Sequence, residues 1–139
     1  MTRVFISHSS KDRWVAKQIR EQIIRCGGST FLDETDIDHG DDFDEKIVSA
    51  ADECGELLVL LTPWSTQRPY IWLEMGLFWQ KKRVVGVLHG ITAEQISMDE
   101  RIPSLLKKID LVDINNIDSY FSQLQKRIKN GKQRRKNET

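Results

Sequence analysis

The sequence has few cysteines, no long hydrophobic run and no net charge. Its two cysteines, Cys26 and Cys54, are too few for a disulfide scaffold and lack the spacing of metal ligands. The longest apolar run, Leu57–Leu61, is far shorter than the roughly 18 residues that suggest a membrane span. The N-terminus lacks the apolar stretch of a signal peptide. These absences favour a cytoplasmic domain with no membrane partner.

The charges balance, with 21 lysine and arginine residues against 21 aspartate and glutamate residues, which argues against a nucleic-acid binder. They are unevenly placed along the chain. Between Asp33 and Glu45 there are eight acidic residues and no lysine or arginine, and seven of the last fourteen residues are basic. Cations suit a helix C-terminus that runs into a solvated tail. We therefore predict one folded domain, residues 1–130, and a flexible basic tail, residues 131–139.

Segments typical of strands and of helices alternate along the chain. Strands are predicted at residues 3–7, 29–32, 56–62, 83–88 and 109–114. Helices are predicted at residues 12–26, about 43–51, 69–81 and 117–129, while residues 91–106 are irregular or weakly helical. Ser9 or Ser10 is expected to cap the first helix, and Ser65 or Thr66 the third.

Five strands that alternate with helices predict an α/β fold, because parallel strands need crossover connections. Right-handed crossovers favour a doubly wound, five-stranded parallel sheet with helices on both faces, in the flavodoxin-like order 2-1-3-4-5. In that order the chain reverses direction between the first and third strands, and ligands bind beyond the carboxyl ends of these strands. Residues 7–12 and 62–70 are therefore expected to form the site.

Glu74 is the only charged residue within segment 69–79, which is otherwise apolar almost all round. That pattern predicts a helix with little solvent-facing surface. A buried carboxylate without a partner is costly, so Glu74 needs a reason to be there. It either points into solvent or pairs with an arginine such as Arg83, or it serves a ligand at the predicted site. In the last case it could engage a sugar or a developing cation.

Four segments carry a resemblance to a known family. They are FISHSSKD (5–12), FLDETDIDHGDDFDEKI (31–47), LLVLLTPWS (57–65) and PYIWLEMG (69–76). In order and spacing they resemble the successive motifs of bacterial TIR domains, over roughly residues 3–114. No single motif is specific, but the four in register favour the assignment. TIR domains are either protein-interaction modules or enzymes that cleave the nicotinamide–ribose bond of NAD⁺.

The resemblance implies that Glu74 is catalytic, because the NAD⁺-cleaving members use one glutamate in the helix after the third strand. It would hold the ribose hydroxyls and stabilise the oxocarbenium-like charge, either electrostatically or as a transient nucleophile. The family often has tryptophan four residues before the glutamate, where this chain has Tyr70, so either Tyr70 or Trp72 would stack on the substrate. The implied substrate-binding residues are Phe5, Ser9, Lys11, Tyr70 and Trp72.

The acidic segment Asp33–Asp41 corresponds to a family loop that closes over the pocket and mediates assembly. The residues expected to serve that loop are Asp36, Ile37, Gly40 and Phe43. As a metal site the segment fails, because an EF-hand pattern started at Asp36 puts Gly40 where an oxygen ligand is needed. The resemblance implies neither a metal nor a cofactor, since NAD⁺ is the substrate. His8, His39 and His89 are predicted to be non-catalytic.

Three functions remain open. The favoured one is a TIR-type NAD⁺ glycohydrolase or cyclase in bacterial defence signalling, which releases nicotinamide and ADP-ribose or a cyclic ADP-ribose isomer. The second is a non-catalytic TIR adaptor that assembles with copies of itself, with other TIR proteins or with a downstream effector. The third is an enzyme like the nucleoside deoxyribosyltransferases, which also place a glutamate at an anomeric carbon.

Overall fold

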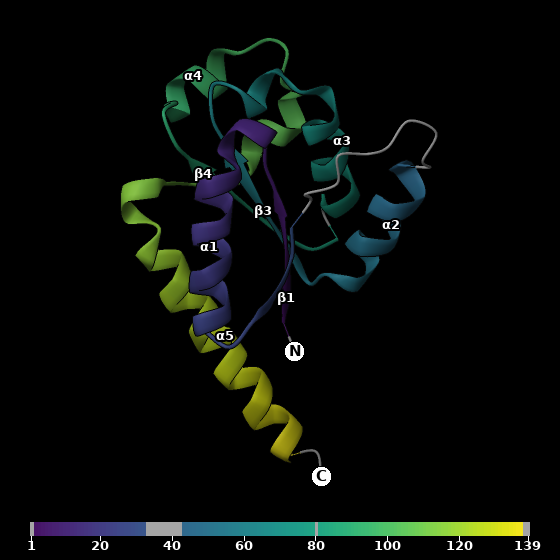
Figure 1. Ribbon diagram of the computed structural model, residues 1–139, viewed down its shortest axis with the longest axis vertical. Coiled ribbons are helices and arrows are strands. Elements are labelled where there is room, and N and C mark those ends of the chain that lie inside the picture. The colour runs from purple at the N-terminus through teal and green to yellow at the C-terminus, as the bar shows by residue number, and fades with distance from the viewer. Residues whose placement is uncertain (1, 33–42, 80, 138–139) are drawn as a thin grey trace.

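A five-stranded parallel sheet forms the middle layer of the computed structural model, which describes residues 2–32, 43–79 and 81–137 (Figure 1). Its strands are β1 (Arg3–Ser7), β2 (Ser29–Leu32), β3 (Glu56–Leu61), β4 (Arg83–Leu88) and β5 (Asp110–Asp113). They pair in the order β2-β1-β3-β4-β5. The α/β class and the 2-1-3-4-5 order predicted from the sequence are confirmed. Every residue of the central strand β3 is buried, as its continuous apolar run indicated.

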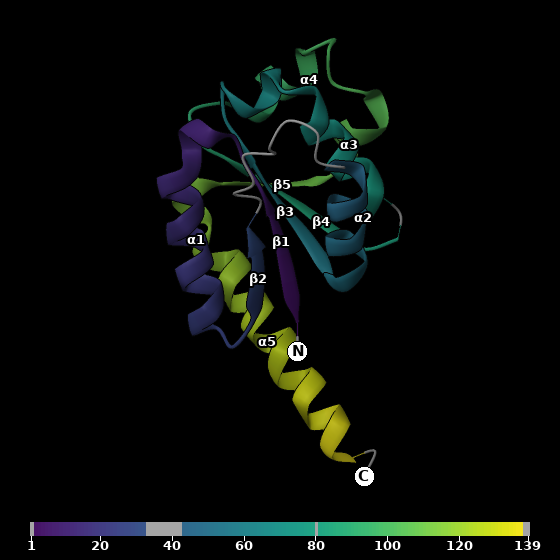
Figure 2. The same cartoon turned by 45° about the vertical axis from the view of Figure 1, so that its right-hand side comes forward.

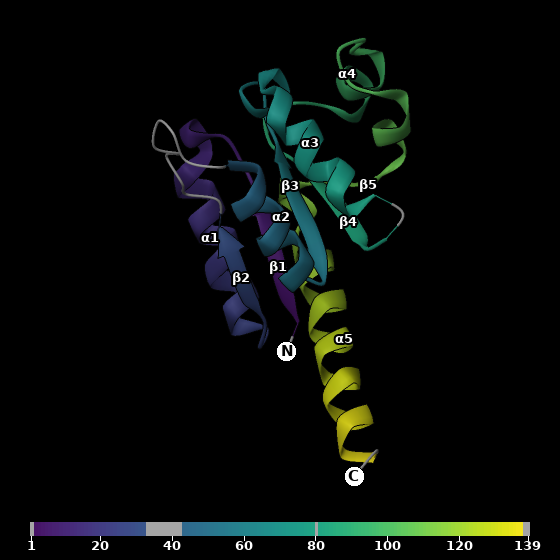
Figure 3. The same ribbon diagram turned by 90° about the vertical axis from the view of Figure 1, so that its right-hand side faces the viewer.

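Helices cover both faces of the sheet, as Figure 2 shows for α1 and α2. The helices α1 (Arg13–Arg25) and α5 (Asp118–Asn137) pack on one face, and α2 (Phe43–Glu53) and α3 (Pro69–Phe78) pack on the other. The short helix α4 (Ala93–Met98) lies beyond the carboxyl ends of β3 and β4 (Figure 3). None of the helices, over the residues that the structure describes, is long and apolar enough to cross a membrane.

Side chains alternate between the two faces of the sheet along each strand, and this divides the hydrophobic core into two clusters. Phe5 belongs to the cluster under α2 and α3, and its ring centroid lies 5.0 Å from that of Phe31 and 5.6 Å from that of Phe78. Val4 and Ile6, on either side of Phe5, belong to the cluster under α1 and α5. Successive strand residues point to opposite faces, so Ser7 emerges on the same face as Phe5 and α3.

Two helices differ from their predicted extent. α3 ends at Phe78 rather than near Lys81, and α5 continues to Asn137 rather than ending at Lys129. Residues 91–106 contain the true helix α4, which begins with a capping box between Thr92 and Gln95. The prediction that α3 has little exposed surface is wrong at Leu73, which is 65% exposed. The helix covers the sheet with one side only, so its other side stays apolar and exposed.

Gly86 on β4 offers a test of how tightly this sheet packs. A methyl group there would lie 2.7 Å from Leu111 Cδ2 and 3.0 Å from Leu61 Cδ1. We expect Gly86→Ala to lower the free energy of unfolding by about 1–3 kcal/mol through overpacking. Gly76→Ala is the matched control, because a methyl group there meets nothing within 4 Å and alanine favours a helix. The packing around Gly86 would be contradicted if urea denaturation showed Gly86→Ala to be more stable than Gly76→Ala.

Candidate functional site

The loop after β1 and the turn after β3 meet at the carboxyl edge of the sheet, as the topology predicted. The register pairs Ser7 of β1 with Val59 of β3, so both strands end at the same edge. Polar side chains gather there and are buried. They are Ser7, His8, Ser9, Asp12, Thr62, Ser65, Thr66 and Glu74. Buried polar groups are costly unless they bond to one another, so their contacts define the site.

Glu74 lies on the inward side of α3 and is only 1% exposed. Ile71, Met75 and Phe78 are buried on the same helix. The hydroxyl of Ser7 donates a hydrogen bond to Glu74 Oε2. Glu74 therefore does not point into solvent. Nor is it placed to pair with Arg83, which begins β4 at the opposite edge of the sheet.

Asp12 joins the two segments of the site. Its Oδ2 accepts hydrogen bonds from Ser9 Oγ at 2.7 Å and from Thr62 Oγ1 at 2.6 Å. The first donor lies in the loop after β1 and the second directly follows β3. Ser9 was expected to cap the first helix, but it makes no cap bond and serves Asp12 instead. The carboxylate of Asp12 therefore connects the ends of two adjacent strands.

Hydroxyl groups also shape the turn that leads into α3. Thr62 Oγ1 accepts a hydrogen bond from the Ser65 backbone N–H at 3.0 Å, and Ser65 Oγ accepts one from the Thr62 backbone N–H at 2.9 Å. Thr66 Oγ1 donates to the Thr62 carbonyl at 3.0 Å. The expectation that Ser65 or Thr66 caps α3 is wrong, because Arg68 holds the N-cap position and its side chain makes no capping bond there. These hydroxyls stabilise the preceding turn instead.

Lys11 and Trp64 lie together at the exposed rim of the site. Lys11 Nζ is 5.9 Å from the centroid of the Trp64 ring, within the range of a cation–π contact. Trp64 is 47% exposed. Their contact places one cation and one aromatic surface beside the two segments that Asp12 joins.

The other predicted site residues lie in several environments. Phe5 is fully buried in the core, and Trp72 is half-buried and packs against the same cluster. Tyr70 belongs to α3 and Phe43 begins α2. The side chains of Tyr70 and Phe43, and all of Asp36, Ile37 and Gly40, lie outside the described part of the chain. Of the predicted set, Ser9 and Lys11 thus lie in the loop after β1, and Glu74 lies against Ser7 at the end of that strand.

Ser7 and Asp12 lie within the segment 7–12 that was expected at the site, but neither residue was assigned a role there from the sequence. The signal for Ser7 was the alternation of the strand, which puts residue 7 on the same face as Phe5. For Asp12 the sequence carried no such signal, because its partner Thr62 is 50 residues away. Within the described ranges, no group of three or more histidine, cysteine, aspartate and glutamate residues could hold a metal ion.

Fold and site together define a flavodoxin-like α/β domain that buries one glutamate beside the carboxyl edge of its first strand. The family model described as "TIR domain" matches residues 4–128, so the chain belongs to the TIR domain family. TIR domains commonly self-associate. No curated protein matches the sequence.

Solved structures share the fold at low sequence identity. The TIR domain of a Toll-related receptor from Hydra magnipapillata has a TM-score of 0.66 at 19% identity, over 89% of this chain and 94% of that one. A TIR-STING receptor from C. gigas has a TM-score of 0.64 at 19% identity, over 87% of this chain and 39% of that one. A CMP N-glycosidase from Clostridium botulinum has a TM-score of 0.54 at 15% identity, over 88% of this chain and 98% of that one.

Proposed function

We propose that this TIR domain is an enzyme that cleaves the bond between nicotinamide and ribose in NAD⁺. The observation that carries the proposal is Glu74, a buried carboxylate held by the Ser7 hydroxyl beside the carboxyl edge of β1. The Clostridium botulinum protein of the same fold is an N-glycosidase, which supports cleavage of an N-glycosidic bond as the reaction class. Its substrate there is CMP, so the choice of NAD⁺ rests on the resemblance of the motifs.

The chemistry needs little more than one negative charge. When the bond between ribose C1′ and the pyridinium nitrogen breaks, its electron pair leaves with nicotinamide, which becomes neutral. Positive charge then develops on C1′ and the ring oxygen, and Glu74 would stabilise it. A charge acts more strongly among buried apolar groups such as Ile71 and Met75 than in water. Water attack with loss of a proton completes ADP-ribose, and attack by the adenine ring completes a cyclic isomer.

Ser7 and Asp12 would support this carboxylate in different ways. Ser7 donates to one oxygen of Glu74 and so sets the orientation of the carboxylate. Asp12 connects the loop that carries Ser9 and Lys11 to the turn that precedes α3. Lys11, at the rim, would contact the diphosphate of the substrate. The roles of Tyr70 and Trp72 in stacking, and of Phe5 beneath the site, are part of the proposal.

Substrate access requires a rearrangement, because only 1% of Glu74 is exposed. We propose that self-association uncovers the carboxylate, with Asp36, Ile37, Gly40 and Phe43 serving the loop that closes over the pocket and joins copies. Defence signalling would be the setting of this activation. A purely adaptor function is the second candidate, and the observation that favours it is the exposed apolar surface at Leu73 on α3.

Incubation with NAD⁺ over a series of protein concentrations tests the proposal. We expect chromatography to show nicotinamide release whose rate per protein molecule rises with concentration, as activation by assembly requires. Parallel incubations with CMP and with deoxynucleosides identify the substrate class. If cytosine is the only base released, the substrate is CMP rather than NAD⁺. If all substrates stay intact at the highest protein concentration, while light scattering shows that the protein has assembled, the result favours the adaptor function.

A further inference from the structure

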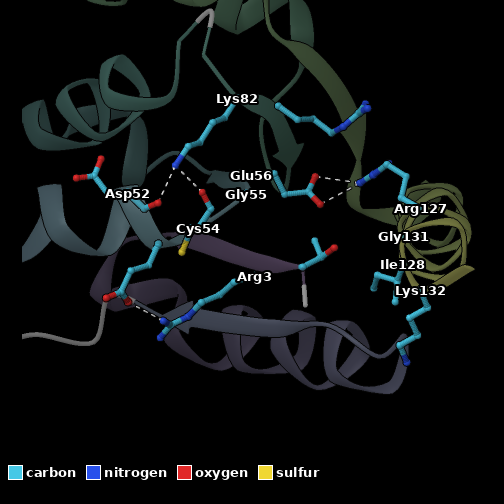
Figure 4. Close-up of a pocket in the computed structure, with 13 residues that line it drawn as sticks. Arg3, Asp52, Cys54, Gly55, Glu56, Lys82, Arg127, Ile128, Gly131 and Lys132 are labelled. Carbon is cyan, nitrogen blue, oxygen red and sulfur yellow. Dashed lines mark hydrogen bonds and ion pairs between the residues drawn. The ribbon is translucent and has the colours of Figure 1, made fainter. Parts of the chain in front are cut away.

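A cavity lies at the edge of the sheet opposite Glu74, where the strands begin. It has a volume of about 720 Å³ and lies among the starts of β1, β3 and β4, the end of α2 and the middle turns of α5 (Figure 4). Five cationic side chains line it: Arg3, Lys82, Arg83, Arg127 and Lys132. Three acidic residues line it as well: Asp52, Glu53 and Glu56. Five positive charges against three negative ones leave an excess of two.

Two of the cations are held by carboxylates. Arg127 on α5 donates twice from its Nη2 atom, to Glu56 Oε1 at 3.0 Å and to Glu56 Oε2 at 2.9 Å, and Glu56 is buried. Arg3 lies 2.9 Å from Glu53. Burial and the nearby charge of Glu56 raise the pKa of Tyr120 well above its usual range. The Arg127–Glu56 and Arg3–Glu53 ion pairs, drawn as dashed lines in Figure 4, fix two walls of the cavity.

Lys82 is held by backbone oxygens rather than by a carboxylate. Its Nζ donates to the Ala51 carbonyl at 2.6 Å, to the Cys54 carbonyl at 2.7 Å and to the Asp52 carbonyl at 3.3 Å, at the C-terminus of α2. Figure 4 shows the bonds to Asp52 and Cys54. A cation at a helix C-terminus opposes the partial negative charge of its carbonyls. These bonds fix the position of Lys82 in the cavity wall.

Arg83 and Lys132 are the remaining cations of the cavity lining. In the described part of the chain neither side chain makes a hydrogen bond or an ion pair, and both residues are exposed. Arg83 is the register partner of Glu56, so its side chain leaves the sheet on the face where Arg127 already binds that carboxylate. Two guanidinium groups thus share one acidic neighbour.

Gly131 keeps the α5 wall of the cavity open. It lies in the interior of a helix, where glycine costs about 0.5–1 kcal/mol relative to alanine. A methyl group there would meet nothing within 4 Å, so packing inside this chain does not require the glycine. Gly131 lines the cavity, and its missing side chain leaves room for an occupant.

We propose that this cavity binds a small anion that carries two adjacent phosphate groups. Its volume lies within the range of about 300–1,000 Å³ that holds small ligands. Arginine and lysine are the side chains that recognise phosphate, and the excess of two charges matches a diphosphate. The site is separate from Glu74, because one lies where the strands begin and the other where they end.

Calorimetric titration of the full chain with pyrophosphate, ADP and phosphate tests the proposal. We expect pyrophosphate to bind saturably with one site per chain, and phosphate to bind more weakly. Since each lost charge-assisted hydrogen bond costs about tenfold or more in affinity, Arg83→Gln with Lys132→Gln should weaken pyrophosphate binding about 100-fold. Tighter binding of ADP than of pyrophosphate identifies a nucleotide as the source of the diphosphate, and the reverse order identifies free pyrophosphate.

Two variants separate this site from general attraction to a basic surface. Lys129→Gln removes an exposed cation of α5 that lies outside the cavity, and it should leave binding unchanged. Gly131→Leu should fill the cavity and abolish binding. The proposal is overturned if Lys129→Gln loses as much pyrophosphate affinity as Arg83→Gln with Lys132→Gln, or if binding does not saturate at millimolar pyrophosphate. A third outcome would overturn the proposal in favour of self-association. If the chain binds no pyrophosphate but self-associates, and the double variant Arg83→Gln with Lys132→Gln abolishes that self-association, the cavity binds the acidic segment of a second copy.

Discussion

Replacement of Glu74 by glutamine is expected to lower the rate of nicotinamide release from NAD⁺ by about 1,000-fold. The amide has nearly the same shape and keeps an oxygen that can accept the hydrogen bond of Ser7. It loses the negative charge that opposes the developing cation, and removal of one stabilising group of this kind costs about 100- to 1,000-fold in kcat. The measurement is initial nicotinamide release at saturating NAD⁺ and at the protein concentration of highest activity.

Ser7→Ala is the matched comparison for that variant. It keeps the charge of Glu74 and removes the hydroxyl that orients it, so we expect kcat to fall by about tenfold, through the loss of one hydrogen bond to a charged group. The melting temperature of Glu74→Gln should stay near that of the parent, because the two side chains are nearly isosteric. If Glu74→Gln keeps more than a tenth of the parent activity, Glu74 is not the catalytic residue.

Replacement of Asp12 by alanine is expected to lower the free energy of unfolding by about 3 kcal/mol. The change leaves the buried hydroxyls of Ser9 and Thr62 without their common acceptor, and each loss costs about 1–3 kcal/mol. It also releases the turn after β3 from the loop after β1, so nicotinamide release should fall as well. Urea denaturation followed by fluorescence measures the stability.

Lys11→Ala serves as the control for Asp12→Ala. Lys11 is the exposed neighbour of Asp12, and substitution at an exposed position changes stability by about 0.5 kcal/mol or less. If Asp12→Ala lowers the free energy of unfolding by less than about 1 kcal/mol, water replaces the carboxylate. That result would contradict the role of Asp12 as the connection between two strands.

Much of the fold could be predicted because its signals are local. The apolar run of β3 indicated a strand buried on both faces, and the helical spacing of apolar residues placed α1 and α5. The alternation of strands with helices then left few topologies, because crossover connections are right-handed. Glu74 was also visible locally, as one charge within an apolar helix. Nearby residues decide each of these features, so the order of the sheet and the unusual position of Glu74 follow from the sequence.

Only the tertiary structure decided which side chains surround Glu74 and Asp12. Ser7 lies 67 residues from Glu74, and Thr62 lies 50 residues from Asp12. The same holds for the cavity where the strands begin, since Arg3 and Lys132 come from opposite ends of the chain. Local periodicity tells which face a residue occupies, but register and crossover determine which residue of another element lies opposite it. The sequence by itself therefore determined the order of the sheet and the place of Glu74 in an apolar helix, and the folded chain determined which side chains lie against that carboxylate.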